Sequence, residues 1–327
     1  MFGVGPLPAI SVIVSNFNGA KYLPKLLETL RAQRGVLLQI IVVDRLSTDE
    51  SRAILAAHPE VVVVTEPPES GLVSGYHAGV ASAVHPLLFF CNEDMWFDPD
   101  CLALQAAHFS APDVGAVDPT QKTYDGATVI HAGTRFVTTR AHQNGPDPGR
   151  VPDFVVPVNS GDVTPIANAA AMMIRREVYE AIGEWDRSFF LDGEDLDLFI
   201  RFWQAGWRAV SEPRALVYHA VSVSNVKLLP GQVPVGRRRY ISARANVLVM
   251  AVKYTPVTRL ALVLAIWLGA MARRILLLRF KQAGWDFSAL REFAGRLGAA
   301  LAYRRAHREL NRRMPVMKFF RAPEFQR

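Results

Sequence analysis

Short apolar runs alternate with helical patterns along the first hundred residues. The runs AISVIVS, LLQIIVVD, VVVVT and LLFFC are rich in β-branched or aromatic residues and stop at polar loops, which predicts buried strands. Between the first two, KYLPKLLETLRAQ repeats leucine at helical spacing, and we expect further helices around 51–57 and in GVASAVHP. Strands that alternate with helices predict an α/β fold, with a mostly parallel sheet covered by helices on both faces.

The pattern weakens after residue 118 and then returns. Residues 118–165 are rich in Gly, Pro, Asp and Thr, and we expect irregular connections and small strands there. Further on, GEDLDLFIRFWQAG predicts a helix with an acidic first turn that ends at Gly206. The segment WRAVSEPRALVYHA then predicts a broken strand that leads to His219.

Three of the predicted strands end in polar residues. Asn16 to Asn18 follow the first strand, Asp44 ends the second, and Asn92 to Asp94 follow LLFFC. Ligands of open α/β sheets bind beyond the carboxyl ends of the strands. The sequence has no G-x-x-x-x-G-K-[ST], and no G-x-G-x-x-G between a strand and a helix, so we expect no glycine-rich phosphate loop. Because carboxylates repel phosphate, a diphosphate at this edge would require a bridging cation.

Three groups of residues are candidates for chemistry, and each also has a structural interpretation. The oxygens of Asn92-Glu93-Asp94 suit Mg²⁺ or Mn²⁺, but such a triplet can also form a solvated turn. Neighbouring carboxylates at Glu194 and Asp195, with Asp197, raise each other's pKa and can supply a base, but acidic residues are also ordinary at a helix start. His219 is either a metal ligand or a packed core residue.

Composition and cysteine content narrow the class of protein. The chain has 327 residues, half of them hydrophobic, which is enough to form a sizeable core. Two cysteines without further partners support neither a disulfide framework nor a cysteine metal site, and they fit a reducing compartment. The start MFGVGPLPAI lacks the charged and apolar regions of a signal peptide, so we expect none.

The net charge of +7 is unevenly distributed. Residues 1–236 contain 17 basic and 26 acidic side chains, whereas residues 237–327 contain 20 basic and 4 acidic ones. A basic region favours an anionic partner, which leaves nucleic acid, an anionic lipid surface and a phosphorylated substrate open. A predicted basic helix, DFSALREFAGRLGAALAYRRAHRELNRR, would add attraction to anionic lipid.

The basic region also contains an apolar segment. Leu260–Ala272 is a run of thirteen residues, shorter than the roughly 20 that a membrane-spanning helix needs. Arg259, Arg273, Arg274 and Lys281 form a partial basic stripe at helical spacing. We predict an amphipathic helix in the membrane interface; the alternative is a helix that packs on the catalytic domain with its arginines in solvent.

The order of these motifs resembles the family-2 glycosyltransferases of the GT-A fold, in particular bacterial rhamnosyltransferase-like and galactofuranosyltransferase-like enzymes that build cell-surface polysaccharide. The resemblance covers about residues 9–225. It rests on SVIVSNFNGAKYLPKLLETLRAQ, IIVVDRLSTDES, GLVSGYHAGVASA, FFLDGEDLDLFIRFWQAGWR and VYHAVSVS.

The resemblance implies a donor site and a metal site. Phe17 would face the nucleobase and Asp44 would hydrogen-bond it, with Asn18 and Glu93 also on the donor side. Asp94 would be the main ligand of a divalent metal, Mn²⁺ or Mg²⁺, that bridges the donor phosphates. Asn92 would be a weaker metal ligand, and His219 would complete the metal shell.

The resemblance also implies the catalytic residues. Asp195 would deprotonate the acceptor hydroxyl while Glu194 orients or tunes it, and Trp185 and Asp186 would lie on the acceptor side. Attack opposite the departing nucleoside diphosphate would invert the anomeric centre.

Three positions depart from the family pattern. Asn92 replaces the first Asp of D-x-D, Arg45 stands where Asp or Asn is usual, and His77 stands where Asn is frequent. These departures leave the identity of the donor open.

The sequence therefore predicts a catalytic domain at 1–236, with a donor half to about 118 and an acceptor half from 119, and a basic membrane-associating region at 237–327. The predicted enzyme transfers a sugar from dTDP-rhamnose or a UDP-sugar to a lipid-linked (polyprenyl diphosphate) or glycan acceptor. It would act in the cytoplasm, peripheral on the inner face of the cell membrane, and would not bind nucleic acid.

Two other functions remain as alternatives. One is a nucleotidyltransferase of related fold, which would normally have a glycine-rich and basic loop near its start that SNFNGAKY does not match. The other is a non-catalytic basic protein that binds membrane or nucleic acid, which would have no need of Glu194 and Asp195; the acidic body of the chain argues against nucleic acid.

Overall fold

The structure is a computed structural model, and it describes residues 6–67, 71–138, 150–153, 155–221 and 235–322. Contacts within the chain divide it into two units. The first comprises residues 1–134, 154–187 and 201–222; the second comprises 135–153, 188–200 and 223–327. Each unit is described by itself. The predicted boundary at residue 236 stays a prediction.

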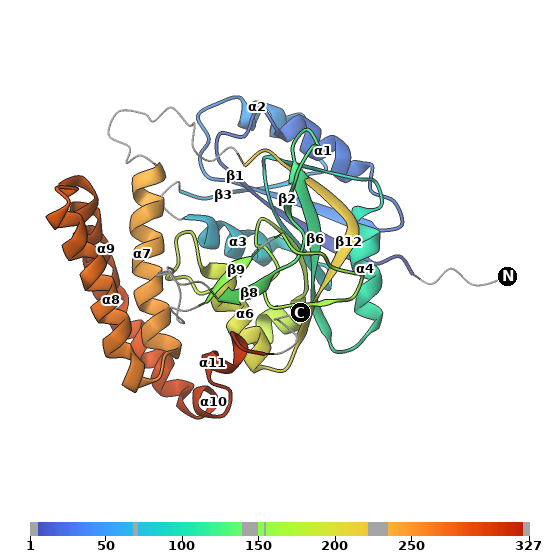
Figure 1. Cartoon of the computed structure of the whole chain (residues 1–327). Helices are drawn as coiled ribbons and strands as arrows, with labels where there is room; N and C mark the ends of the chain where they lie inside the picture. The colour runs from blue at the N-terminus through green and yellow to red at the C-terminus, as the bar shows by residue number, and fades with distance from the viewer. Residues whose placement is uncertain (1–5, 68–70, 139–149, 154, 222–234, 323–327) are drawn as a thin grey trace. The chain divides into compact units, whose positions relative to one another are not determined.

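Four parallel strands form one half of the sheet in the first unit (Figure 1). They lie in the order β4 (Leu87–Asn92), β1 (Ala9–Asn16), β2 (Leu37–Asp44) and β3 (Val62–Thr65). The helices that connect them are α1 (Leu23–Arg31), α2 (Ser51–Ala56) and α3 (Gly71–Ser82). This arrangement confirms the predicted alternation of strands and helices, and α3 begins earlier than GVASAVHP indicated.

The alternation of side chains along β1 places helices on both faces of the sheet. Ile10, Val12 and Val14 belong to a core cluster that includes the leucines of α1. On the opposite face Ile13 meets Gly79 of α3 so closely that a Cβ on Gly79 would lie 2.4 Å from the Ile13 side chain. The predicted covering of both faces is confirmed.

The other half of the sheet is mixed in direction. It contains β6 (Val114–Thr123), β10 (Val163–Thr164), β11 (Ala171–Arg175) and β12 (Arg208–His219), with β5 (Met95–Phe97) paired to β12 and β7 (Val129–His131) paired to β6. β11 runs antiparallel to β4 and β6, whereas β12 runs parallel to β6. A register shift between Glu212 and Leu216 interrupts β12, which confirms the broken strand before His219.

Three shorter helices accompany this half of the sheet. They are α4 (Cys101–Ala107), the 3₁₀ turn His108–Ser110 and α5 (Arg176–Ala181). The predicted acidic helix is α6 (Glu194–Gln204), and Gly206 follows it with φ +84°. The first part of α6, to residue 200, belongs to the second unit.

Strand register brings the polar strand ends together. Asn16 lies opposite Asp44, and Ser15 lies opposite Asn92, because β1 pairs with both β2 and β4. His219 lies opposite Met95, the residue after Asp94. The carboxyl edge of the sheet therefore gathers residues from four strands, as expected for a ligand site in an α/β sheet.

The second unit consists mainly of helices. They are α7 (Val235–Tyr254), α8 (Val257–Leu276), α9 (Phe280–Ala306), α10 (Arg308–Arg313) and α11 (Val316–Phe319), and the hairpin of β8 (Arg135–Thr138) and β9 (Arg150–Asp153) belongs to the same unit. α7 and α9 lie side by side, and α8 packs beside them (Figure 1).

A buried carboxylate joins the three long helices. Asp286 of α9 is fully buried and accepts hydrogen bonds from Tyr240 (2.9 Å) and Arg244 (3.1 Å) of α7, and from Arg274 (3.0 Å) of α8. Arg244 also lies over the ring of Trp267, 4.4 Å from its centre. Buried charges of this kind require such partners, so the three helices form one packed group.

The apolar segment of α8 is only partly available to a membrane. Val263 and Trp267 are buried, whereas Leu262 and Leu268 are exposed. One face of α8 thus packs within the second unit and the other faces outward. None of the helices in the described ranges has the length and apolarity needed to cross a membrane.

Candidate active site

Asp44 organises the loops that follow β1 and β2. Its carboxylate accepts hydrogen bonds from the side chain of Asn16 (2.8 Å), the backbone N–H of Ser47 (3.1 Å) and the Ser47 hydroxyl. Arg52 lies 3.5 Å away, and Asp44 is only 1% exposed. A carboxylate can accept about four hydrogen bonds. Asp44 therefore holds the two loops, and its contact with a nucleobase stays a prediction.

Asn18 and Gly19 close the loop after β1 against its neighbours. Asn18 has φ +55°, its backbone N–H donates to Ser47 Oγ (2.9 Å), and its side-chain oxygen accepts from the N–H of Thr48 (2.8 Å). A Cβ on Gly19 would lie 2.5 Å from Cγ of Glu93. This position thus requires glycine. Sequence reasoning missed Ser47, although S-T-D was part of the motif that carried the resemblance.

Arg45 supplies positive charge at the same edge. Its guanidinium lies 5.4 Å from the ring centre of Phe17, and burial lowers its pKa. Burial, and then the charge of Asp94, raise the pKa of Glu93 to about 7, while Arg45 acts in the opposite direction. The unusual arginine of the sequence thus offsets part of the negative charge of Glu93 and Asp44.

Asp94 and His219, which were predicted to bind a metal, lie next to each other. Both are buried, and Nε2 of His219 lies 3.1 Å from Oδ1 of Asp94. The backbone N–H of Ala220 donates to the carbonyl of Asp94 (2.9 Å), which fixes the two strand ends together. Residues about 125 positions apart in sequence therefore meet at one point, as the resemblance implied.

The pair fits a divalent cation. Nδ1 of His219 lies 3.2 Å from Oε1 of Gln121, so the ring donates there and leaves a lone pair on Nε2. Nε2 is buried and, apart from its 3.1 Å contact with Oδ1 of Asp94, has no hydrogen-bond partner among the described residues. Two ligands on adjacent octahedral positions lie about 3 Å apart when each bond is about 2.1 Å. The separation of Asp94 and His219 matches this value.

Most of the metal shell would have to come from outside these two side chains. In the described ranges no group of three or more His, Cys, Asp or Glu residues could hold a metal ion. Asn92 still belongs to β4, where its backbone N–H donates to the carbonyl of Ala170 (3.1 Å), and its role as a ligand stays a prediction. Gln121, which orients His219, was not found from the sequence.

Trp185 lies in the core rather than on an accessible surface. It is 1% exposed and contacts the rings of Tyr76 (5.8 Å between centres) and Phe90 (5.5 Å). Nε2 of His77 lies 2.8 Å from the Trp185 carbonyl oxygen, so His77 holds this turn. The Trp185 side chain is therefore packed in the core, and the acceptor-side roles of Trp185 and of the half-buried Asp186 stay predictions.

Glu194 and Asp195 begin α6 in the second unit. Glu194 is 6% exposed, and burial, followed by the charges of Asp195 and Asp192, raises its pKa to about 8. Asp195 is half-buried, and its Oδ1 accepts from the N–H of Leu196 (2.7 Å). The sequence predicted that these neighbouring carboxylates raise each other's pKa, and Glu194 has a raised pKa with Asp195 among its causes.

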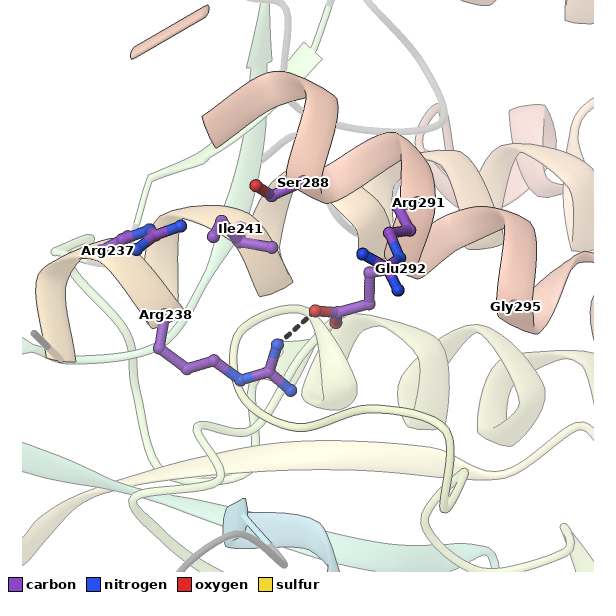
Figure 2. Close-up of a pocket in the computed structure, with 7 residues that line it drawn as sticks. All are labelled: Arg237, Arg238, Ile241, Ser288, Arg291, Glu292 and Gly295. Carbon is purple, nitrogen blue, oxygen red and sulfur yellow. Dashed lines mark hydrogen bonds and ion pairs between the residues drawn. The ribbon is translucent and has the colours of Figure 1, made fainter. Parts of the chain in front are cut away.

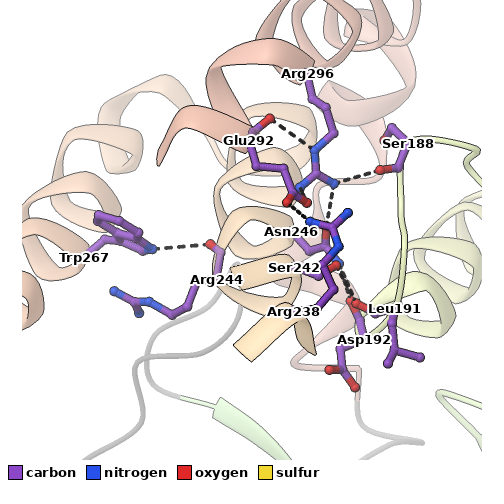
Figure 3. A network of polar contacts seen from close by, with 10 residues as sticks. All are labelled: Ser188, Leu191, Asp192, Arg238, Ser242, Arg244, Asn246, Trp267, Glu292 and Arg296. Atoms are coloured by element: carbon purple, nitrogen blue, oxygen red, sulfur yellow. Dashed lines mark hydrogen bonds and ion pairs between the residues drawn. The ribbon is translucent and has the colours of Figure 1, made fainter. Parts of the chain in front are cut away.

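Residues of α7 and α9 hold the loop that precedes α6 (Figure 3). Ser242 donates to the carbonyl of Leu191 (2.9 Å), and the side-chain amide of Asn246 donates to the same carbonyl (3.0 Å) and to that of Asp192. Arg296 of α9 donates to the carbonyl of Ser188 (2.8 Å) and to Asn246 Oδ1 (2.7 Å). Besides carrying positive charge, the basic region thus holds in place the loop that leads into the acidic first turn of α6.

Asp197 has a structural role in the same unit. It is fully buried and pairs with Lys253, which is 1% exposed, and it accepts a hydrogen bond from Tyr254 (2.7 Å). These contacts join the first turn of α6 to the end of α7. Asp197 is therefore committed to an ion pair, while Glu194 and Asp195 remain the candidates for chemistry.

Comparison with protein families decides the classification. The sequence model described as "Glycosyl transferase family 2" matches residues 11–183, more than half of the chain. The chain belongs to glycosyl transferase family 2. The matched residues include the polar sheet edge from Asn16 to Asp94, and the mixed α/β sheet is of the GT-A type that the sequence predicted.

Curated relatives of this glycosyltransferase family member come from bacteria. A pre-mycofactocin glycosyltransferase of Mycobacterium tuberculosis is 27% identical over 212 residues, which are 64% of this chain and 42% of that protein. The O-antigen biosynthesis protein RfbC of Myxococcus xanthus is 29% identical over 229 residues, 66% of this chain and 18% of that protein. The chain thus spans less than half of the length of these relatives.

Solved structures share the fold at low identity. The mannosyltransferase PcManGT of Pyrobaculum calidifontis, in complex with GDP-Man and Mn²⁺, gives a TM-score of 0.52 at 18% identity, covering 89% of this chain and 88% of that one. S. aureus TarS 1-349 in complex with UDP-GlcNAc gives 0.53 at 16% identity, covering 96% and 91%.

Proposed function

We propose that the protein is an inverting, metal-dependent glycosyltransferase. It transfers a sugar from a nucleotide donor, either rhamnose from dTDP-rhamnose or a sugar from a UDP donor, to a hydroxyl of a lipid-linked or cell-surface glycan acceptor. The observation that carries this proposal is the Asp94–His219 pair at the edge where Asp44 and Asn18 order the neighbouring loops. The GDP-Man, Mn²⁺ and UDP-GlcNAc in the similar structures support it.

On the donor side, Asp94 and His219 would hold Mn²⁺ or Mg²⁺. The bound cation would neutralise charge on the departing nucleoside diphosphate. Phe17 would face the base, and Arg45 beside it would offer a guanidinium to donor oxygens. Gln121 fixes the His219 ring so that Nε2 remains free to bind the cation.

On the acceptor side, Asp195 would accept the proton of the attacking hydroxyl. Its exposure is intermediate, so the carboxylate can reach a substrate, whereas Glu194 is buried beside it. When Glu194 ionises, its charge makes Asp195 a stronger base. Attack by the acceptor oxygen opposite the leaving diphosphate inverts the anomeric carbon.

The turn between α8 and α9 favours peripheral binding to an anionic membrane surface. Leu276, Leu277, Leu278 and Phe280 are between 52% and 81% exposed. The exposed basic residues Arg273, Arg279 and Lys281 flank them along the chain. Apolar side chains beside basic ones are typical of segments that insert shallowly into an anionic lipid surface. This location would suit a lipid-linked acceptor on the inner face of the cell membrane.

Flotation with anionic liposomes tests the membrane part. We expect binding at low salt that weakens at high salt, and Leu277→Asp with Leu278→Asp should reduce it. The lack of any liposome binding at low salt would reject the proposed membrane association.

The transferase proposal is tested with a panel of nucleotide sugars. Purified protein is incubated with each donor, with and without Mn²⁺ or Mg²⁺ and with acceptor lipid, and nucleoside diphosphate release is measured for wild type and Asp195→Asn. We expect metal-dependent release with at least one donor and a large loss in Asp195→Asn. If no donor gives metal-dependent release, the transferase proposal is wrong; unchanged release in Asp195→Asn rejects only the base assignment.

A further inference from the structure

A second polar site lies within the helices of the second unit. A pocket of about 400 Å³ opens between α7 and α9 (Figure 2). Its lining includes Arg237, Arg238 and Ile241 from α7, and Ser288, Arg291 and Glu292 from α9. None of these residues lies at the sheet edge described above, and the sequence marked Ser288, Arg291 and Glu292 only as part of a basic helix expected to attract anionic lipid. The pocket is therefore a candidate binding site for a separate ligand.

The charges of the lining are only partly balanced. Glu292 pairs with Arg238 and with Arg296 (2.7 Å), so the single carboxylate is already held by two guanidinium groups. Arg237 and Arg291 are exposed, and within the described ranges neither side chain has a hydrogen bond or ion pair to another residue. The pocket thus presents two uncommitted guanidinium groups, one from each helix, which suits an anion with more than one negative charge.

The position of Arg237 is not explained by the stability of α7. Arg237, Arg238 and Arg239 lie in the first turns of a helix that begins at Val235 and has no acidic residue in its first turn. Positive side chains are unfavourable at a helix N-terminus, where the dipole attracts anions. Arg238 and Arg239 are compensated by Glu292 and Asp192, respectively. Arg237 has no such compensation, and an anion in the pocket would provide it.

We propose that this pocket binds a lipid-borne phosphate or diphosphate group, namely that of the lipid-linked acceptor. The proposal rests on the proposed function, because it names the group by which the acceptor is held. Guanidinium groups bind phosphate oxygens in pairs, and Arg237 and Arg291 would do so from opposite sides while Ile241 lines the pocket as an apolar contact. An anionic phospholipid headgroup offers the same chemistry, so the test separates the two sources.

The test uses the full chain and two matched double variants. Arg237→Ala/Arg291→Ala removes the uncommitted pocket arginines, and Arg305→Ala/Arg312→Ala removes two exposed arginines elsewhere in the same unit. Both variants lose the same charge. Binding is measured by calorimetry with inorganic pyrophosphate and farnesyl diphosphate, and by flotation with phosphatidylglycerol vesicles.

We expect wild type to bind farnesyl diphosphate, with affinity at least about tenfold lower in the pocket variant and almost unchanged in the matched control. A pocket variant that loses the diphosphates but still floats with phosphatidylglycerol identifies the acceptor as the source. A pocket variant that loses only flotation identifies the phospholipid headgroup as the source and contradicts the assignment to the acceptor. Absence of binding by wild type to all three probes, or equal losses in the two variants, would overturn the proposal.

Two readouts separate this proposal from its alternatives. The midpoint of thermal unfolding of Arg237→Ala should equal or exceed that of wild type, because the variant relieves positive charge at the helix start. Donor hydrolysis without acceptor should be the same in the pocket variant and in wild type. If wild type lacks donor hydrolysis but binds farnesyl diphosphate in the pocket, the proposed function fails while the pocket stands.

Discussion

Replacing Glu194 with glutamine should change how the free energy of unfolding depends on pH. The glutamate is 6% exposed, and burial beside Asp195 and Asp192 raises its pKa from 4.5 to about 8. In the unfolded chain the group loses its proton near pH 4.5, whereas in the folded protein it keeps the proton until about pH 8. The folded state therefore binds more protons over this range, so the glutamate lowers stability progressively as pH rises from about 4.5 to 8.

The magnitude follows from the two pKa values. Each pH unit between them corresponds to about 1.4 kcal/mol, so wild type should lose about 4 kcal/mol relative to Glu194→Gln between pH 5 and pH 9. Glutamine has a similar shape and does not titrate. The quantity compared is how the difference in unfolding free energy between the two proteins changes with pH. A pH-independent loss of stability caused by the N–H groups of glutamine therefore cancels.

Urea unfolding at pH 5, 7 and 9 measures this difference directly. Glu194→Gln should become progressively more stable than wild type as pH rises, with the change complete shortly above pH 8. If the difference between Glu194→Gln and wild type is the same at pH 5 and pH 9, the raised pKa of Glu194 is refuted, and with it the idea that Glu194 tunes Asp195.

Three further substitutions test other parts of the structure. Gly19→Ala should lower the free energy of unfolding by about 1–3 kcal/mol, because its Cβ would clash with Glu93; urea unfolding with unchanged stability would contradict this close packing. Asp286→Ala should cost about 3–5 kcal/mol, because it leaves Arg244 buried without its partner, and a thermal midpoint equal to wild type would be inconsistent with the buried network. Asn246→Ala should reduce sugar transfer while leaving liposome flotation unchanged, since the loop before α6 loses two donors; full activity would show that these bonds do not position Glu194.

The polar edge of the sheet could be predicted from the sequence because its signals are local. Asp44 and Asn92 to Asp94 follow apolar strands, and parallel strands end on the same edge. The meeting of Asp94 with His219 came from the family resemblance, since residues so far apart in sequence have no local signal for contact. The raised pKa of Glu194 depends on burial, which the acidic motif alone does not specify.

The role of the basic region was only partly predictable. Its charge indicated a membrane surface, but Ser242 and Asn246 also hold the loop before α6. This second role could not be predicted, because the sequence does not show which loop the two side chains meet. A signal was present, since Arg238, Ser242 and Asn246 repeat at intervals of four and mark a polar helix face. Trp185 was placed on the acceptor side by the family resemblance, and the motif alone did not show that its ring lies in the core.

Manganese binding tests the central claim most directly. Mn²⁺ is titrated into wild type, Asp94→Ala and His219→Ala in the presence of UDP, and free Mn²⁺ is followed by electron paramagnetic resonance. The account predicts UDP-dependent binding by wild type, near-complete loss in Asp94→Ala and clearly weakened binding in His219→Ala, because each variant removes one proposed ligand. Equal binding by all three proteins would contradict the assignment of the metal to the ends of β4 and β12.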